Sequence, residues 1–171
     1  MAISGTLIRL IRRQFVLDWH GIHGAPHWAR VRLNGLRLAA LTGANPSVVE
    51  LFAFLHDSQR RNDGHDPFHG PRAAAFARSL PRELVRLSTD EVELLAHACE
   101  GHSDGHMKAD VTVQTCWDAD RLDLGRVGIV PDSDRLCCEA ARDAEFVRWA
   151  YARSLSGRST EMFDALAELP D

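Results

Sequence analysis

The sequence is poor in aromatic residues and has no long uninterrupted hydrophobic run. It contains a single tyrosine, and Phe, Trp and Tyr together make up 7% of its 171 residues. All-β folds are enriched in aromatic and β-branched residues, so this composition argues against them. Ala, Leu and Arg, which favour helices, are frequent instead. No apolar segment is long enough to span a bilayer, and we expect no membrane partner.

The cysteines form no C-x-x-C pair and no regular spacing. Such an arrangement indicates neither a zinc knuckle nor a disulfide framework. We therefore expect reduced thiols and a cytoplasmic protein, because disulfides are rare in that compartment. The four cysteines are Cys99, Cys116, Cys137 and Cys138.

Other functional signatures are also missing. The apolar start of the chain is interrupted by Arg9, Arg12 and Arg13, whereas a secretory signal needs an unbroken apolar stretch. The glycine-rich loops GxGxxG and GxxxxGK[S/T], which bind phosphates, do not occur. The formal net charge of −4 provides no basic surplus, so we do not expect a nucleic-acid partner.

What the sequence does contain is a helical pattern, with apolar residues spaced three and four apart through most of its length. No segment alternates as a half-buried strand would, and residues 127–130 are extended at best. The pattern predicts an all-α, single-domain bundle of about seven to nine helices over residues 1–171. Its motif-bearing core covers about 20–125, and helices within 133–168 pack on that core. The expected helices are 4–18, 26–41, 45–57, 70–79, a short one after Pro81, 88–101, 111–124, 133–153 and 159–168.

One helix stands out because it joins a core sequence to two strong metal ligands. Residues 48–57 read VVELFAFLHD and end in His56 and Asp57. A helix that is apolar on all sides is buried, and a buried carboxylate is costly unless it is paired or coordinated. Further ligands could come from His27, His102 and Asp118 on other helices. Such a nitrogen and oxygen shell suits a divalent transition metal: Fe, Mn, Zn, Co or Ni.

Three segments, HWARV, FAFLHD and CWDADRLD, occur in this order between about residue 23 and residue 124. They resemble the H…HD…D pattern of the HD-domain superfamily of metal-dependent phosphohydrolases. The resemblance implies an all-helical fold and a first metal ion bound by His27, His56, Asp57 and Asp118.

Two further histidines, His69 and His102, resemble those of the binuclear branch of this superfamily. Each is followed by a small residue, and each stands where binuclear relatives place an additional ligand. The resemblance implies that they bind a second ion and that Asp57, the expected catalytic residue, is shared by both ions. The sequence leaves open whether one or two ions bind.

The residues around the HD pair indicate how a phosphorylated substrate could be held. Arg60 and Arg61 stand three and four residues after Asp57, and a guanidinium binds phosphate well; Arg30 could face the same cleft. Family members often carry Lys shortly after the pair, whereas this chain has Arg. The polar loop RRNDGHDPFHG contains Asp63 and Asp66, which we expect in the pocket wall.

These features favour a hydrolase that acts on a phosphate ester or anhydride through metal-activated water. Two-metal sites suit displacement at phosphorus, and a nucleotide or a related small molecule is the expected substrate. Two alternatives stay open: a di-iron oxygenase of the HD class, and a catalytically silent nucleotide-binding module. The sequence decides neither the native metal nor the oligomeric state.

Overall fold

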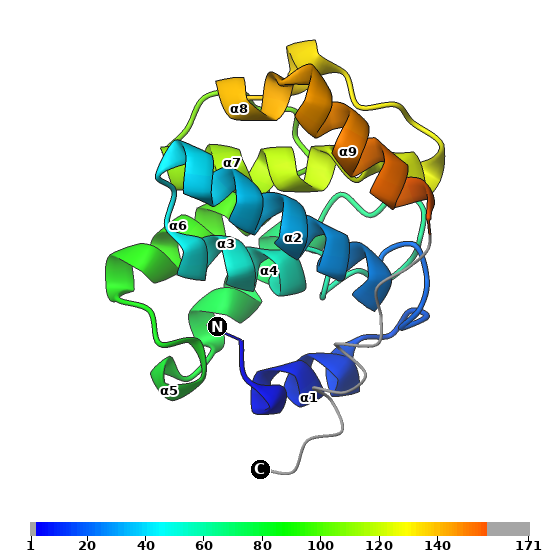
Figure 1. Cartoon of the computed structure of the whole chain (residues 1–171). Helices are drawn as coiled ribbons and strands as arrows, with labels where there is room; N and C mark the ends of the chain where they lie inside the picture. The colour runs from blue at the N-terminus through cyan, green and yellow to red at the C-terminus, as the bar shows by residue number, and fades with distance from the viewer. Residues whose placement is uncertain (1–2, 157–171) are drawn as a thin grey trace.

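Helices joined by turns and loops make up the computed structural model, which describes residues 3–156 (Figure 1). No strand occurs within this range, which confirms the all-α prediction. None of its helices is both long and apolar enough to cross a membrane. The elements are α1 (Gly5–Gln14), α2 (Ala25–Thr42), α3 (Pro46–Leu55), α4 (His69–Ser79), α5 (Arg82–Val85), α6 (Thr89–Gly101), α7 (Val111–Arg121), the 3₁₀ turns η1 (Leu124–Val127) and η2 (Ser133–Arg135), α8 (Glu139–Arg142) and α9 (Ala144–Leu155).

Capping residues explain where several helices begin. The Ser88 side chain accepts a hydrogen bond from the backbone of Glu91, and Glu91 bonds back to Ser88, forming the expected capping box of α6. Asn45 caps α3 in the same way, by accepting from the first backbone N–H groups of that helix. Asp143 caps α9, so the single helix expected over 133–153 is divided into η2, α8 and α9.

Two other boundaries differ from expectation or fall beyond the described range. Helix α1 ends at Gln14 rather than near residue 18, because the next residue takes an extended conformation. The helix expected over 159–168 lies outside the described residues.

Helix α3 is the buried centre of the bundle. Every residue from Val48 to Leu55 is buried, because α2, α6 and α7 pack around this helix. Helices α8 and α9 lie against the other side of α2 and α7 (Figure 1), where they form a smaller apolar cluster that includes Leu38 and Leu122. The burial of α3 follows from its apolar sequence, and it places the end of α3 deep inside the protein.

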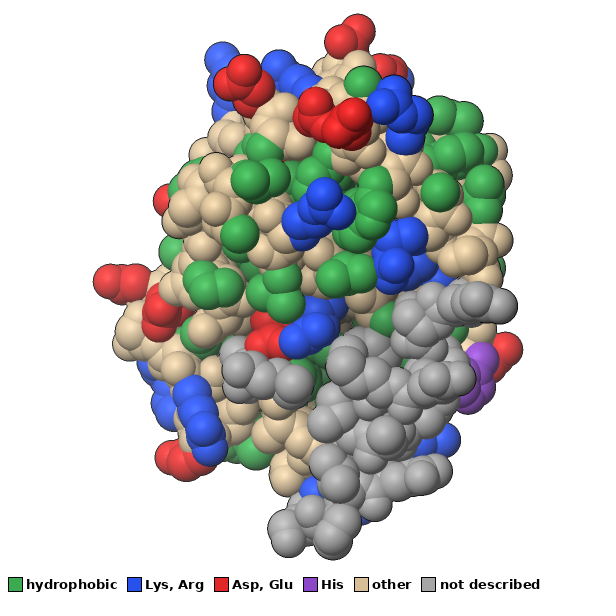
Figure 2. Space-filling model, viewed as in Figure 1, with side chains coloured by type: hydrophobic (Ala, Val, Ile, Leu, Met, Phe, Trp, Pro, Cys, Tyr) green, Lys and Arg blue, Asp and Glu red, His purple; other side chains and the backbone are tan. Residues whose placement is uncertain are grey.

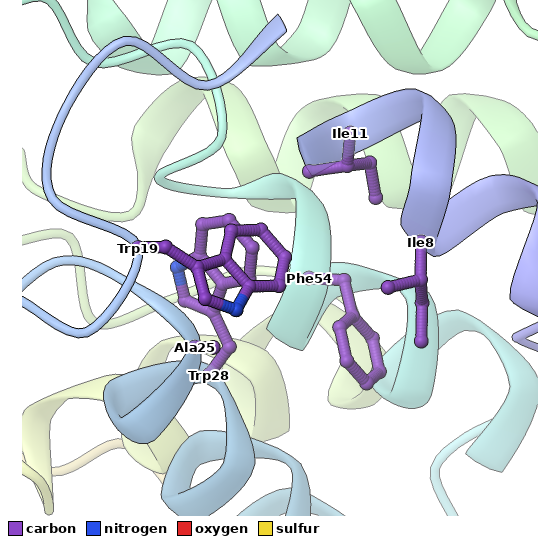
Figure 3. A pocket seen from close by; sticks show the side chains of 6 residues that line it. All are labelled: Ile8, Ile11, Trp19, Ala25, Trp28 and Phe54. Carbon is purple, nitrogen blue, oxygen red and sulfur yellow. The ribbon is translucent and has the colours of Figure 1, made fainter. Parts of the chain in front are cut away.

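Helix α1 covers one end of the core. Ile8 and Ile11 project from α1 toward Phe54 of α3, beside the indoles of Trp19 and Trp28 (Figure 3). The two indole rings meet edge to face with centroids 5.3 Å apart, a favourable arrangement for aromatic pairs. These contacts anchor the loop between α1 and α2.

The face formed by α2, α8 and α9 is chemically mixed. Figure 2 shows hydrophobic side chains interspersed with arginines and carboxylates over these helices. On this face Arg37 lies 4.4 Å from the ring centroid of Trp149, a cation–π contact. Histidine appears only at the edge of this view.

A close approach of α4 and α6 depends on Gly70. A Cβ atom added there would lie 2.5 Å from the backbone oxygen of Glu100 and 2.9 Å from that of Cys99. Real Cβ atoms do not come so close to backbone atoms, so only glycine allows this spacing of the helices. The contact brings together His69, at the start of α4, and His102, at the end of α6.

Candidate metal centre

Six side chains from five helices or helix ends converge on one buried cluster. One comes from the beginning of α2, and two come from the end of α3 and the residue that follows it. The other three come from the beginning of α4, the end of α6 and the last turns of α7. The members of this His/Asp cluster are His27, His56, Asp57, His69, His102 and Asp120.

Hydrogen bonds fix the tautomer of each histidine in the cluster. Every Nδ1 atom faces an oxygen that can only accept, so Nδ1 carries the proton and the Nε2 of a neutral ring presents its lone pair. The acceptors are the carboxylate of Asp123 for His27, at 2.7 Å, and the backbone carbonyls of Phe52, Asp66 and Cys99 for His56, His69 and His102. This is the arrangement in which proteins orient metal-binding histidines.

The Nε2 atoms meet in two pairs. Those of His27 and His56 are 3.0 Å apart, and those of His69 and His102 are 2.9 Å apart. Two lone pairs at such a separation repel each other unless a proton or a cation lies between them. If two nitrogens each lay about 2.1 Å from one ion, with a nitrogen–ion–nitrogen angle of roughly 90°, they would be about 3 Å apart. Each pair therefore fits a metal ion.

Asp57 lies between the two histidine pairs. Its Oδ2 atom is 3.7 Å from the Nε2 atoms of both His27 and His56. Its Oδ1 atom is 3.4 Å from Nε2 of His69 and 3.5 Å from that of His102. Each carboxylate oxygen thus faces a different pair, as in a carboxylate that bridges two ions.

Asp120 lies beside the first histidine pair, where it could act as a further ligand. Its Oδ1 atom lies 3.3 Å from Nε2 of His27 and 3.8 Å from Nε2 of His56. That oxygen is buried and accepts no hydrogen bond among the described residues. A buried carboxylate oxygen without a donor is costly, and a metal ion would compensate it.

The pKa shifts favour a neutral His56 and an ionised Asp57, whereas they favour a proton on His102. Burial lowers the pKa of His56 to about 3, which keeps this ring neutral. Burial alone would raise the pKa of Asp57, but the neighbouring His56 and His102 rings hold it well below its usual value. The pKa of His102 is raised, because its bond to Asp57 outweighs burial. The cluster therefore attracts positive charge, from a proton or from a metal ion.

The structure does not bring Asp118 into this cluster, which corrects the expected ligand set. Its carboxylate accepts hydrogen bonds from the backbone N–H groups of Cys137 and Cys138, both at 2.7 Å. Two residues along a helix correspond to a rotation of about 200°, so Asp118 and Asp120 lie on opposite sides of α7. Asp120 takes the place for which the sequence suggested Asp118.

Asp123 is another residue beside the cluster that the sequence did not indicate. It accepts from His27, and it also accepts from Nε and Nη2 of Arg30, at 2.7 and 3.1 Å. Its spacing of three from Asp120 was a usable signal, because residues three apart share a helix face. Arg30, expected to contact substrate, is instead buried and holds Asp123 in place.

The other predicted substrate residues occupy different positions in the loop after α3. Arg60 donates from Nε to Oδ1 of Asp57 at 2.9 Å, and it lines the cleft described below. Arg61 is exposed, and its backbone N–H donates to the buried carboxylate of Asp66. Asp63 is hydrogen-bonded to Nδ1 of His23 at 2.9 Å. Five residues were predicted to contact substrate, and only one of them, Arg60, lines the cleft. The other four are Arg30, Arg61, Asp63 and Asp66.

A cleft of about 730 Å³ opens from the His/Asp cluster. In Figure 1 the loops before α2, after α3 and after α7 lie together on the right side of the bundle. These loops contribute much of the lining. The polar lining includes His23, Asp57, Arg60, His102, Asp120 and Arg126. The apolar lining includes Leu124, Val127, Ile129, Val130 and Pro131.

The cysteines offer no competing nucleophile. All four are free, as the sequence predicts. Burial raises the pKa of Cys137 to about 12 and that of Cys138 to about 11, and thiols in such surroundings are not readily ionised. The chemistry of the cleft therefore belongs to the His/Asp cluster.

The functional conclusion rests on this geometry. No family model, curated protein or solved structure matches the chain. The structure itself shows an all-helical protein with a buried His/Asp cluster that could hold metal ions.

Proposed function

We propose that the protein is a metal-dependent hydrolase of phosphate esters or anhydrides, related to the HD-domain superfamily, with two divalent ions. The observation that carries this proposal is the pair of Nε2–Nε2 contacts on the two sides of Asp57. A stand-alone structural role would not need four histidines with their lone pairs turned toward one carboxylate. Small phosphorylated molecules, nucleotides among them, are the substrates that such a site would serve.

The ligands divide into two sets that share one residue. His27, His56, Asp57 and Asp120 would hold the first ion, and Asp57, His69 and His102 the second. Their nitrogen and oxygen donors suit Fe, Mn, Zn, Co or Ni. When bound, the ions would lower the pKa of a water molecule and polarise the phosphoryl oxygens.

Two arginines would bind the phosphoryl group. Arg60 reaches the cleft while it is bonded to Asp57. Arg126 lines the same cleft, with Nη1 3.8 Å from Oδ1 of Asp120, and its Nε donates to the backbone carbonyl of Ile22. Held guanidinium groups neutralise the charge that develops on phosphoryl oxygens during displacement.

His23 would transfer the proton. Asp63 accepts from its Nδ1 atom, which leaves Nε2 as the second exchangeable position of the ring. His23 lines the cleft together with Asp57, and burial lowers its pKa. A neutral ring oriented in this way can accept a proton from a water molecule at Nε2 and then pass it to a leaving oxygen.

Metal analysis combined with a phosphate-release panel tests the proposal. We expect about two ions per chain, phosphate release with at least one ester or anhydride, and loss of release after treatment with a chelator. Asp57→Asn should lose both metal and activity, while the exposed Asp104→Asn should retain them. A protein that binds no metal would refute the proposal. Oxygen consumption by the ferrous form without phosphate release would indicate the oxygenase alternative, and nucleotide binding without turnover the silent module.

A further inference from the structure

Much of the apolar part of the cleft is formed by one short segment that hydrogen bonds hold in place. Val127, Ile129 and Val130 are 41%, 52% and 62% exposed, and all three line the cleft. Gly128 between them has φ 80° and donates to the carbonyl of Gly125. We call residues 127–131 the aliphatic wall.

The aliphatic wall is pre-formed rather than loose. The backbone N–H of Ile129 donates to the carbonyl of Leu124, and Arg126, next to the wall, is bonded to Ile22. Single exposed apolar residues are ordinary, but a group of them inside a cleft marks a surface that binds an apolar ligand. The wall lines the same cleft as Asp57 and Asp120, so one ligand could contact both.

The described lining has no Phe, Tyr or Trp ring on which a nucleobase could stack, and the guanidinium of Arg135 faces the carboxylate of Asp132 at 3.8 Å. Proteins bind bases by stacking on aromatic rings or guanidinium planes and by hydrogen bonds to the base edges. Among the described lining residues there is no Phe, Tyr, Trp, Asn or Gln. The guanidinium of Arg121 is engaged, since it donates to the carbonyls of His106 and Arg135.

We propose that the organic part of the substrate is an aliphatic chain rather than a nucleoside. The phosphate lies at the His/Asp cluster, and the chain lies on Val127, Ile129 and Val130. The assignment of the phosphate end rests on the proposed function. The ligand class is therefore a phosphate monoester or anhydride of a short aliphatic alcohol or acid.

Alkylphosphonates test this inference without turnover, because their C–P bond is not a substrate for phosphate-ester hydrolysis. Calorimetry on the metal-loaded protein would compare methyl-, propyl- and pentylphosphonate with adenosine monophosphate. Each methylene buried on the wall should lower Kd roughly threefold to fourfold. Adenosine monophosphate should bind no more tightly than methylphosphonate.

A matched pair of variants locates the effect. Ile129→Asn should remove most of the dependence on chain length and leave the Kd of methylphosphonate unchanged. Val16→Asn alters another solvent-exposed aliphatic residue, which lies outside the cleft, and it should behave as the wild type. A Kd that does not change with chain length, or adenosine monophosphate binding tenfold more tightly than pentylphosphonate, would overturn the inference.

Phosphate release separates this inference from the proposed function. If longer chains bind more tightly but no alkyl phosphate releases phosphate, the role of the aliphatic wall is supported and hydrolysis is refuted. Equal release from alkyl phosphates of all lengths and from nucleotides would sustain hydrolysis and refute the role of the wall.

Discussion

The two carboxylates at positions 118 and 120 of α7 should respond in opposite ways to the same substitution. Asp118 accepts two backbone hydrogen bonds and lies away from the His/Asp cluster. Asp120 presents to that cluster an oxygen that accepts no hydrogen bond within the described part of the chain. We therefore expect Asp118→Asn to lower stability but not metal binding, and Asp120→Asn to do the reverse.

The size of each effect follows from what the asparagine side chain can do. An amide at position 118 has one acceptor oxygen, so its NH₂ group would face one of the N–H groups of Cys137 and Cys138. Leaving a buried donor unpaired costs about 1–3 kcal/mol. In a domain of this size, about 2 kcal/mol lowers Tm by about 4–8 °C.

At position 120 the change removes a metal ligand and a buried charge. Loss of a group that merely supports a ligand weakens metal binding about 10- to 100-fold, so loss of the Asp120 carboxylate should cost about 100-fold or more. The metal-free variant should unfold close to the wild-type temperature, because the oxygen that Asp120 turns toward the cluster accepts no hydrogen bond that the substitution could remove.

Metal content by mass spectrometry and thermal unfolding by circular dichroism, with and without chelator, measure both effects. The wild type should be stabilised by added metal, since a ligand that binds only the folded state raises Tm. The Asp118→Asn variant should keep this increase in Tm, and Asp120→Asn should lose most of it. The reasoning fails if Asp118→Asn loses the metal while Asp120→Asn retains it.

Three other changes test separate parts of the structure. Gly70→Ala should force α4 and α6 apart, lower stability by about 1–3 kcal/mol and reduce the metal content from two ions toward one. Gly64→Ala, where an added Cβ meets no close neighbour, should change neither stability nor metal content. Equal effects of the two substitutions would contradict this account. Burial lowers the pKa of His56 from 6.5 to about 3, so the unfolded chain binds more protons below about pH 6.5 and the metal-free protein should lose stability from there toward pH 3. Urea titrations at several pH values should show that the His56→Gln variant loses less stability over this pH range than the wild type. The exposed His97→Gln variant should lose as much as the wild type. Asp123→Asn should weaken metal binding about 10- to 100-fold, measured by competition with a chromophoric chelator, and wild-type affinity would refute its supporting role.

Helical periodicity was sufficient to predict the class of the fold and the buried centre of the bundle. The segment VVELFAFLHD could only be a core helix, and so the burial of His56 and Asp57 followed from it. Ser88 and Glu91 predicted the beginning of α6 in the same local way. These features depend on residues close in sequence.

The features that the sequence did not predict depend on contacts between distant residues. Nothing in CWDADRLD states which side of α7 meets α3, so the choice between Asp118 and Asp120 needed the packed structure. Arg30 follows His27 by one helical turn, and it suited a substrate contact until Asp123, 93 residues away, proved to be its partner. The division of 133–153 by Asp143 was missed because a cap inside an apolar pattern is a weak signal.

The position of Asp57 between the two histidine pairs has a consequence for how the protein fills with metal. Both Asp57 and Asp120 lie within 4 Å of the Nε2 atoms of His27 and His56, whereas Asp57 alone, among the described residues, lies that close to those of His69 and His102. The first ion to bind would draw electron density from Asp57, so the second would meet a weaker ligand and a nearby positive charge. Loading should therefore be sequential, with a wide range of metal concentration over which the protein holds a single ion. Over that range, activity would follow the supply of metal to the second position.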